Sequence, residues 1–136
     1  FYIFSPLINE NIALTFSVMF SSSSYAGWTA VREGTGAINS GDIYYLDFER
    51  IRKHDGYVYF WRLNDHKKPS PQGYLSFKLY VQGDCKLFRF KSLSYSVHNE
   101  PMGGGLGDTM NKPDTEWSYP HPDSANEIVL KLACNR

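Results

Sequence analysis

The sequence predicts an α+β domain, in which a single antiparallel sheet of five or six strands carries one helix at its C-terminal end. Aromatic residues make up 16% of the 136-residue chain, and such side chains favour strands. Short segments of alternating polar and apolar residues are separated by Gly, Asp and Pro turn signals. An apolar stripe with helical spacing lies close to the end of the chain. This length is enough to bury one core as a single domain.

The first three strands are predicted from short apolar segments. Residues 28–33 alternate, and residues 42–48 follow a Ser-Gly turn signal. The charged segment 49–55 ends in an Asp-Gly pair, which is typical of a hairpin turn. Residues 57–63 are apolar on both faces, so we expect that strand in the centre of the sheet.

The later strands are longer. Residues 74–82 show the cleanest alternation in the chain, which is typical of a half-buried antiparallel strand. Residues 86–97 change phase part-way, which predicts a β-bulge or bend near Lys91-Ser92. Residues 99–122 contain four glycines and four prolines and are expected to form a loop.

The last element is predicted to be a helix. Ser124 and Glu127 have the spacing of a capping box at its start. Four apolar side chains then follow the i, i+3, i+4, i+7 rule, which places them on one face for packing against the sheet: Ala125, Ile128, Val129 and Leu132.

Residues 1–26 resemble a signal peptide and are treated separately from the domain at 27–136. They contain an apolar stretch, Ile12–Phe20, and then Ser24-Tyr25-Ala26, with small residues at the −3 and −1 positions of a cleavage site. We expect export, with a mature protein that begins at Gly27. The apolar stretch is too short and too interrupted for a membrane-spanning helix. Alternatively, the segment is retained and tethers the domain to a membrane or a partner.

The chain has two cysteines, Cys85 and Cys134. In an exported protein they most simply form one disulfide, which would stabilise the fold by about 4 kcal/mol in the chain-entropy model. The alternative is a pair of buried free thiols in a reducing compartment. Their spacing matches neither a redox nor a zinc motif.

Composition and motifs argue against several functions. Fourteen basic and fourteen acidic residues give a net charge near zero, so we expect no nucleic-acid partner. The Gly-rich segment 102–107 does not lead into a helix, which excludes a phosphate-binding loop. Asp47 and Glu49 are interpreted as a solvated sheet edge, because no other group converges on them.

The four histidines are far apart and are interpreted as solvent-exposed loop residues, not as metal ligands: His54, His66, His98 and His121. No nucleophile–base pair or metal-ligand spacing appears, so the sequence predicts neither an enzyme nor a cofactor or metal site.

The remaining hypothesis for the basic clusters and the Gly-rich segment is that they form a protein-contact surface. Two basic clusters could form one cationic patch for acidic glycans or protein carboxylates, although such clusters are more often simply solvated. The Gly-rich segment is expected to be a flexible hairpin or a contact loop. The candidate contact residues are Arg50, Arg52, Lys53, His54, His66, Lys67, Lys68, Met102, Gly103, Gly104 and Gly105.

Several pieces between Trp28 and Cys134 resemble the surface-adhesin protein E family of bacterial envelope proteins. They are Tyr44-Tyr45-Leu46-Asp47 with Ile51, Trp61 and Leu63, Asp84-Cys85 with Phe88-Arg89, Leu93-Ser94-Tyr95, Pro101-Met102-Gly103, Trp117 and the terminal Ile128–Cys134.

The resemblance implies an antiparallel sheet whose C-terminal helix is tied down by a disulfide. It also implies a periplasmic or outer-surface location and, as in the best-known member, a dimeric adhesin that binds host matrix proteins and plasminogen. We therefore expect an exported, non-enzymatic protein-binding domain, with membrane contact only through residues 1–26. The alternative is an accessory structural subunit of a larger envelope complex, held by that same segment.

Overall fold

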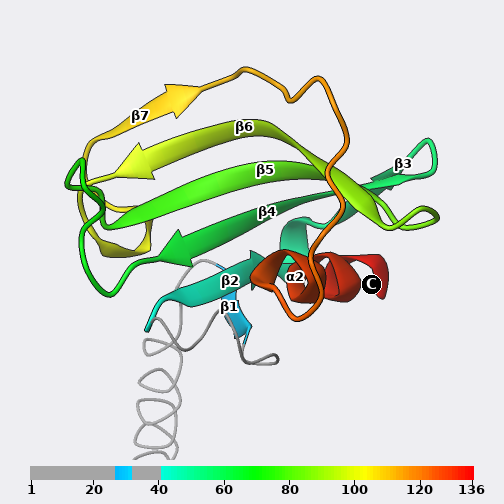
Figure 1. Ribbon diagram of the computed structural model, residues 1–136, viewed down its shortest axis with the longest axis horizontal. Coiled ribbons are helices and arrows are strands. Elements are labelled where there is room, and N and C mark those ends of the chain that lie inside the picture. The colour runs from blue at the N-terminus through cyan, green and yellow to red at the C-terminus, as the bar shows by residue number, and fades with distance from the viewer. Residues whose placement is uncertain (1–26, 32–40) are drawn as a thin grey trace, which may run out of the picture.

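The computed structural model describes residues 27–31 and 41–136, so the expectations for residues 1–26 and for the end of the first predicted strand lie outside the described residues. A seven-stranded antiparallel sheet has the order β1-β2-β4-β5-β6-β7, and β3 pairs with β4 (Figure 1). The strands are β1 (Trp28–Val31), β2 (Ile43–Asp47), β3 (Arg52–His54), β4 (Tyr57–Asp65), β5 (Ser76–Asp84), β6 (Arg89–His98) and β7 (Gly107–Met110). The helices are the short 3-10 turns η2 (Phe48–Arg50) and η3 (Pro101–Gly103) and the α-helix α2 (Ala125–Cys134).

The predicted fold class is confirmed, and β4 lies in the interior of the sheet, as its apolar faces predicted. The sheet has more strands than expected, because β3 and β7 were read as a turn and a loop. β3 forms through the Asp55-Gly56 turn, whose residues have φ values of 50° and 83°. β7 consists of four exposed residues without alternation, so the sequence pattern does not indicate a strand that pairs with β6.

The phase change in β6 is a β-bulge, as predicted. Tyr80 of β5 pairs with Ser94, whereas the next residue, Val81, pairs with Ser92. Leu93 is therefore the extra residue. After it, the residues of β6 point to the opposite sheet face from the one that their alternation before the bulge would give.

The C-terminal helix and its cap are also confirmed. The Ser124 hydroxyl accepts a hydrogen bond from the backbone N–H of Glu127 at 3.2 Å. The Glu127 carboxylate accepts from the backbone N–H of Asp123, one residue earlier than in a standard capping box. The last helical residue, Cys134, forms the expected disulfide with Cys85, so the free-thiol alternative is wrong. Cys85 lies in the turn between β5 and β6.

The core lies between α2 and one face of the sheet. Val58 and Phe60 of β4 pack with Val81 of β5 against Val129 and Leu130 of the helix. A side chain on Gly83 would bring its Cβ within 2.7 Å of the Leu130 side chain, so glycine at that position allows the close approach of helix and sheet. The helix thus covers the part of this face formed by the start of β4 and the end of β5. The face continues beyond the N-terminus of α2.

Within the two described ranges, no helix combines the length and the apolar character needed to cross a membrane.

Candidate functional site

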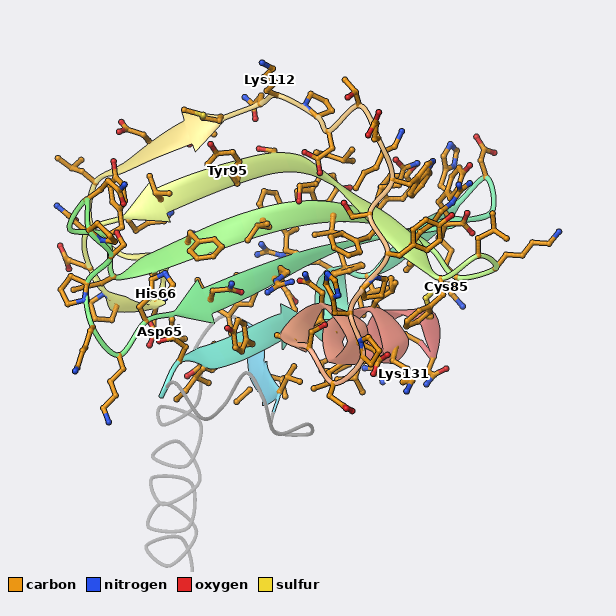
Figure 2. All side chains as sticks on the ribbon, viewed as in Figure 1. Asp65, His66, Cys85, Tyr95, Lys112 and Lys131 are labelled. Atoms are coloured by element: carbon orange, nitrogen blue, oxygen red, sulfur yellow. A yellow bond between two sulfur atoms is a disulfide. The ribbon has the colours of Figure 1, made fainter. Side chains whose placement is uncertain are left out.

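The two predicted basic clusters lie at opposite ends of β4. Arg50, Arg52, Lys53 and His54 belong to η2 and β3, beside the start of β4. The His66–Lys68 cluster follows the end of β4, and nine strand residues separate the two by roughly 27 Å. In Figure 2, Asp65 and His66 lie at the end of the sheet opposite Cys85. The two clusters, considered above as one possible cationic patch, therefore lie apart in the folded chain.

The Gly-rich segment meets the second cluster. Backbone N–H groups of Met102 and Gly103 donate to Asp65 and to the Ser76 hydroxyl, each at 2.8 Å. Gly103, with a φ of 72°, also lies directly against the Lys78 side chain. The segment is thus fastened to the sheet beside Asp65, the residue that directly precedes the 66–68 cluster.

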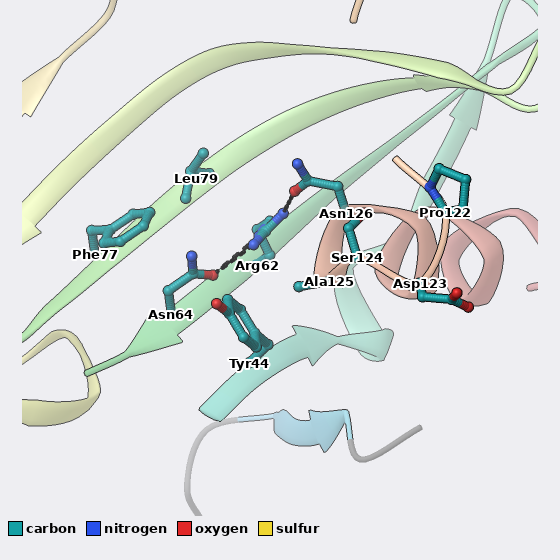
Figure 3. Close-up of a pocket in the computed structure, with 10 residues that line it drawn as sticks. All are labelled: Tyr44, Arg62, Asn64, Phe77, Leu79, Pro122, Asp123, Ser124, Ala125 and Asn126. Atoms are coloured by element: carbon teal, nitrogen blue, oxygen red, sulfur yellow. Dashed lines mark hydrogen bonds between the residues drawn. The ribbon is translucent and has the colours of Figure 1, made fainter. Parts of the chain in front are cut away.

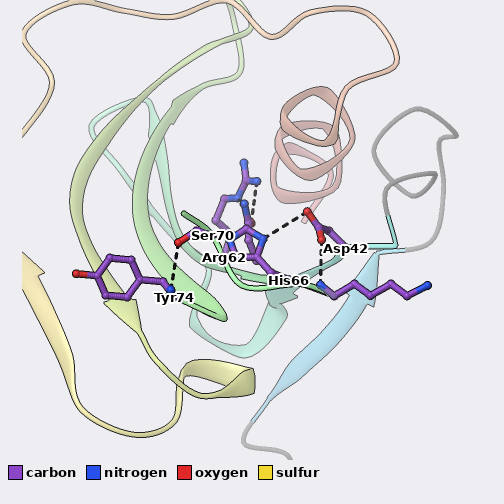
Figure 4. A network of polar contacts seen from close by, with 7 residues as sticks. Asp42, Arg62, His66, Ser70 and Tyr74 are labelled. Carbon is purple, nitrogen blue, oxygen red and sulfur yellow. Dashed lines mark hydrogen bonds and ion pairs between the residues drawn. The ribbon is translucent and has the colours of Figure 1, made fainter. Parts of the chain in front are cut away.

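The His66 loop is held in place by Asp42 (Figure 4). One carboxylate oxygen of Asp42 lies 3.3 Å from Nδ1 of His66, and the other accepts the backbone N–H of Lys67 at 3.0 Å. His54 and His121 are exposed, as expected.

Two residues, His66 and His98, correct the expectation that all four histidines are exposed. The His66 side chain is only 20% exposed beside Asp42, and His98 is the more deeply buried of the two. It is buried at the end of β6, with Nε2 2.8 Å from the Ser96 hydroxyl. Burial lowers the pKa of His98, and nearby Lys78 lowers it further. Its Nδ1 is buried without a hydrogen-bond partner in the described part of the chain. Among the described residues, no three His, Cys, Asp or Glu side chains gather where they could hold a metal ion.

The sheet face opposite α2 carries a row of aromatic side chains. Tyr80 of β5 lies between two residues of β4, with its ring centroid 4.8 Å from that of Trp61 and 6.2 Å from that of Tyr59. The Tyr59 hydroxyl accepts a hydrogen bond from Gln82 at 3.1 Å. These aromatic rings are half-buried, and the described helices do not cover them.

Trp117 extends this row from the loop between β7 and α2. Its ring lies 5.5 Å from that of Tyr57, and Arg89 and Lys91 lie over it at 4.5 and 4.8 Å. We call the surface formed by Tyr57, Tyr59, Trp61, Tyr80 and Trp117 the aromatic face. Trp117 is held there because its neighbour Ser118 pairs with Phe90 of β6.

The basic side chains beside the aromatic face differ in whether they form an ion pair with a carboxylate. Arg89 donates to Asp84 at 2.8 Å, and Asp84 also accepts from the backbone N–H groups of Lys86 and Leu87. Burial opposes ionisation of Asp84, but these hydrogen bonds outweigh it and lower its pKa. Within the described ranges, the ion pairs include neither Lys78 nor Lys91, so the face keeps a local positive charge.

The face that carries α2 holds a cavity of about 580 Å³ beyond the N-terminus of the helix (Figure 3). β2, β4 and β5 form its floor, and the start of α2 forms one wall. It is lined by Tyr44, Arg62, Asn64, Phe77, Leu79, Pro122, Asp123, Ser124, Ala125 and Asn126.

Arg62 is the cation of this cavity and is only 7% exposed. The side-chain oxygen of Asn64 accepts from its Nε at 3.2 Å and its Nη2 at 2.9 Å, and that of Asn126 accepts from Nη1. Its guanidinium carbon lies 5.6 Å from the centroid of the Tyr44 ring. Burial lowers the pKa of Arg62 to about 10, so the group remains charged at neutral pH.

Sequence reasoning missed this site, because residues 57–63 were read as a strand that is apolar on both faces. The available signal was the alternation within β4. Val58 and Phe60 face the helix, so Arg62 and Asn64, at the next two positions of the same parity, had to point toward the same face.

Comparison with known proteins identifies the family. The family described as Surface-adhesin protein E matches residues 28–135. The chain belongs to the surface-adhesin protein E family. The resemblance inferred from the sequence is therefore confirmed, and membership implies an exported, cell-surface protein.

Solved structures of protein E from Haemophilus influenzae share the fold of this family member. Crystal form II matches with a TM-score of 0.60 and 17% identity over 84% of this chain and 91% of that chain. Another structure of that protein matches with a TM-score of 0.56 and 19% identity, over 84% of this chain and 88% of that chain. Protein E from a non-typeable strain matches with a TM-score of 0.54 and 18% identity, over 84% of this chain and 79% of that chain. Identities this low establish the fold alone. No curated protein sequence matches the chain.

Proposed function

We propose that this protein is a non-enzymatic adhesin domain of the bacterial envelope that binds an external protein through its aromatic face. The observation that carries the proposal is the aromatic face itself, in a member of a surface-adhesin family. Tyr and Trp are enriched in protein interfaces, where they supply large contact areas at a low entropy cost. A strand-borne aromatic row is also rigid, so little order has to be gained on binding.

The charges beside the aromatic face favour an acidic ligand segment. Lys91 lies over the Trp117 ring, and Lys78 lies on the other side of the row, against Gly103. Two cations without carboxylate partners in the described ranges attract aspartate- and glutamate-rich polypeptide. An extracellular-matrix-type protein with such a segment fits this surface, and the loops at 66–68 and 102–105 extend it.

The expectations on location and organisation complete the proposal. Residues 1–26 direct export, residues 27–136 form the adhesin domain, and the domain acts at the outer surface as a monomer or a homodimer. An accessory role in an envelope complex is the competing function, and the same experiment tests it.

The test compares two charge reversals. Lys91→Glu places a negative charge on the aromatic face, and Lys131→Glu makes the same change on the exposed side of α2. Binding to a panel of immobilised matrix proteins and plasminogen is measured by surface plasmon resonance. We expect Lys91→Glu to weaken binding by about tenfold, through slower association and faster dissociation, and Lys131→Glu to leave it unchanged.

Two results would contradict the proposal. Equal effects of the two variants would remove the aromatic face from the binding surface. Absence of binding to every external protein, together with stoichiometric envelope proteins co-purifying with the native chain, would establish the accessory role instead. Unchanged near-UV circular dichroism of both variants is the control for folding.

A further inference from the structure

Arg62 carries a buried positive charge that the described chain does not neutralise. A guanidinium group has five N–H donors. Three hydrogen bonds reach the neutral amide oxygens of Asn64 and Asn126, which leaves one N–H on each terminal nitrogen without a protein acceptor in the described residues. Buried charges in proteins normally have an opposite charge beside them, because desolvation is otherwise costly.

The same guanidinium borders a cavity of suitable size. About 580 Å³ lies within the usual range for small-ligand sites. Phe77 and Leu79 of β5 make part of the cavity floor apolar, and Tyr44 of β2 adds an aromatic ring. Polar side chains of β4 and of the start of α2 also line the cavity, so it combines apolar surface with groups that can fix the orientation of a ligand.

The position of α2 adds to the positive potential. The helix begins at Ala125, on the cavity wall, so the positive end of its dipole is directed toward the same space as Arg62. Asp123 stands at the rim and is exposed. The balance of one buried cation and one rim carboxylate suits an anion of single charge better than a phosphate dianion.

We propose that this cavity, the Arg62 pocket, binds a carboxylate carried on an apolar body, with the guanidinium holding the carboxylate and Phe77, Leu79 and Tyr44 enclosing the body. A planar guanidinium accommodates two carboxylate oxygens, and such charge-assisted pairs are the strong hydrogen bonds of binding sites. The pocket opens on the sheet face opposite the aromatic face, so this inference stands apart from the proposed adhesin contact.

A free small organic acid and the C-terminal carboxylate of a polypeptide present the same chemistry. The pocket walls recognise an apolar group next to the carboxylate in both cases. The two sources differ in length beyond that group, which an experiment can separate.

The test uses the full chain labelled with ¹⁵N and two probes that differ only in charge, 3-phenylpropionate and 3-phenylpropionamide. The Nε–H signals of the arginines are followed by NMR during titration. We expect the acid to bind at least about tenfold more tightly than the amide and to shift the Arg62 signal. Equal affinities, or a shift confined to Arg89, would overturn the proposal.

Two matched variants localise the effect. Arg62→Met keeps the side-chain volume and removes the charge, and Arg89→Met does the same at an arginine that already has a carboxylate partner. We expect Arg62→Met to abolish the preference for the acid and Arg89→Met to retain it. Retention of the preference in Arg62→Met would overturn the proposal, and the wild-type titration remains decisive if either variant fails to fold.

Thermal unfolding with and without ligand provides a second readout. An excess of 3-phenylpropionate should raise the unfolding temperature of the wild type and of Arg89→Met, because a ligand that binds only the folded chain stabilises it. The unfolding temperature of Arg62→Met should not change on addition of the acid. An equal rise in Arg62→Met would overturn the proposal.

The source of the carboxylate is resolved by a pair of hexapeptides that end in phenylalanine, one with a free and one with an amidated C-terminus. Tighter binding of the free-acid peptide than of 3-phenylpropionate would support the proposal with a polypeptide terminus as the ligand. Binding of 3-phenylpropionate but of neither peptide would support it with a free organic acid. No binding of any acid would overturn it.

Discussion

The two ends of α2 differ in whether the strongly interacting side chains beside them have partners within the chain. At the C-terminal end, Cys134 is bonded to Cys85, and the adjacent turn holds Arg89 against Asp84. At the N-terminal end, Arg62 faces a cavity with only amide oxygens for acceptors. The contrast teaches that stability is concentrated where every strong group has a partner inside the chain. The end that lacks such partners keeps its binding capacity for a molecule from outside.

The two arginines show the contrast within one residue type. The hydrogen bond from Arg89 to Asp84 raises the pKa of Arg89. Burial without a carboxylate lowers that of Arg62 to about 10. The two shifts have different main causes, which are burial at Arg62 and the hydrogen bond to Asp84 at Arg89.

Removal of the disulfide is expected to have the largest effect. Replacing Cys85 and Cys134 by serine opens a loop with a sequence separation of 49, which lowers the free energy of unfolding by about 4 kcal/mol in the chain-entropy model. Urea unfolding of the oxidised wild type and the double variant measures the difference. A reductant should destabilise the wild type and leave the double variant unchanged. A loss below about 1 kcal/mol would place the main stabilisation elsewhere.

Asp84→Asn should have the next largest effect, about 2 kcal/mol at pH 7, because hydrogen bonds to a charged acceptor are weakened. The pKa of Asp84 is lower in the folded than in the unfolded chain. Its contribution is therefore complete above the unfolded value near 4 and is lost as the pH falls further.

The measurement for Asp84 is urea unfolding at pH 7 and at pH 3. The difference in stability between wild type and Asp84→Asn should be smaller at pH 3 than at pH 7. Asp108→Asn, on the exposed strand β7, is the matched control and should behave like the wild type at pH 7. A constant difference between Asp84→Asn and wild type at both pH values would show that the charge of Asp84 contributes nothing.

The smallest expected effect is at the other end of the helix. Ser124→Ala removes the acceptor for the backbone N–H of Glu127 and should lower the free energy of unfolding by about 1 kcal/mol. The control is Ser118→Ala, an exposed serine whose hydroxyl has no hydrogen bond within the described residues. Equal thermal midpoints for the two variants would show that the cap does not limit stability.

Sequence reasoning recovered the parts of the fold that depend on local pattern. The alternation of β5, the bulge in β6 and the cap at Ser124 each involve residues close together in the chain. β7 was missed because an exposed edge strand needs no apolar alternation. The burial of His98 was missed because a residue at the end of β6 looks like the start of a loop.

The candidate sites were harder to predict than the fold. The basic clusters are visible in the sequence, but the length of β4 that separates them is a property of the folded sheet. The aromatic face depends on Trp117, which reaches Tyr57 only through a bridge formed by a long loop. To predict the Arg62 pocket, one must know where α2 begins relative to the sheet, and that position follows from packing at Gly83 and the disulfide.

The disulfide also sets how the protein would respond to mechanical load. A pull on the C-terminal residue Arg136 passes from Cys134 directly to Cys85, so the residues between them carry no tension while the bond is intact. That shielded stretch, which contains β6, β7 and α2, would otherwise add about 160 Å of extension, at roughly 3.3 Å per residue. Under such a pull on the chain after Cys134, Trp117 and the helix stay inside a covalently closed loop even when the strands before Cys85 are peeled away.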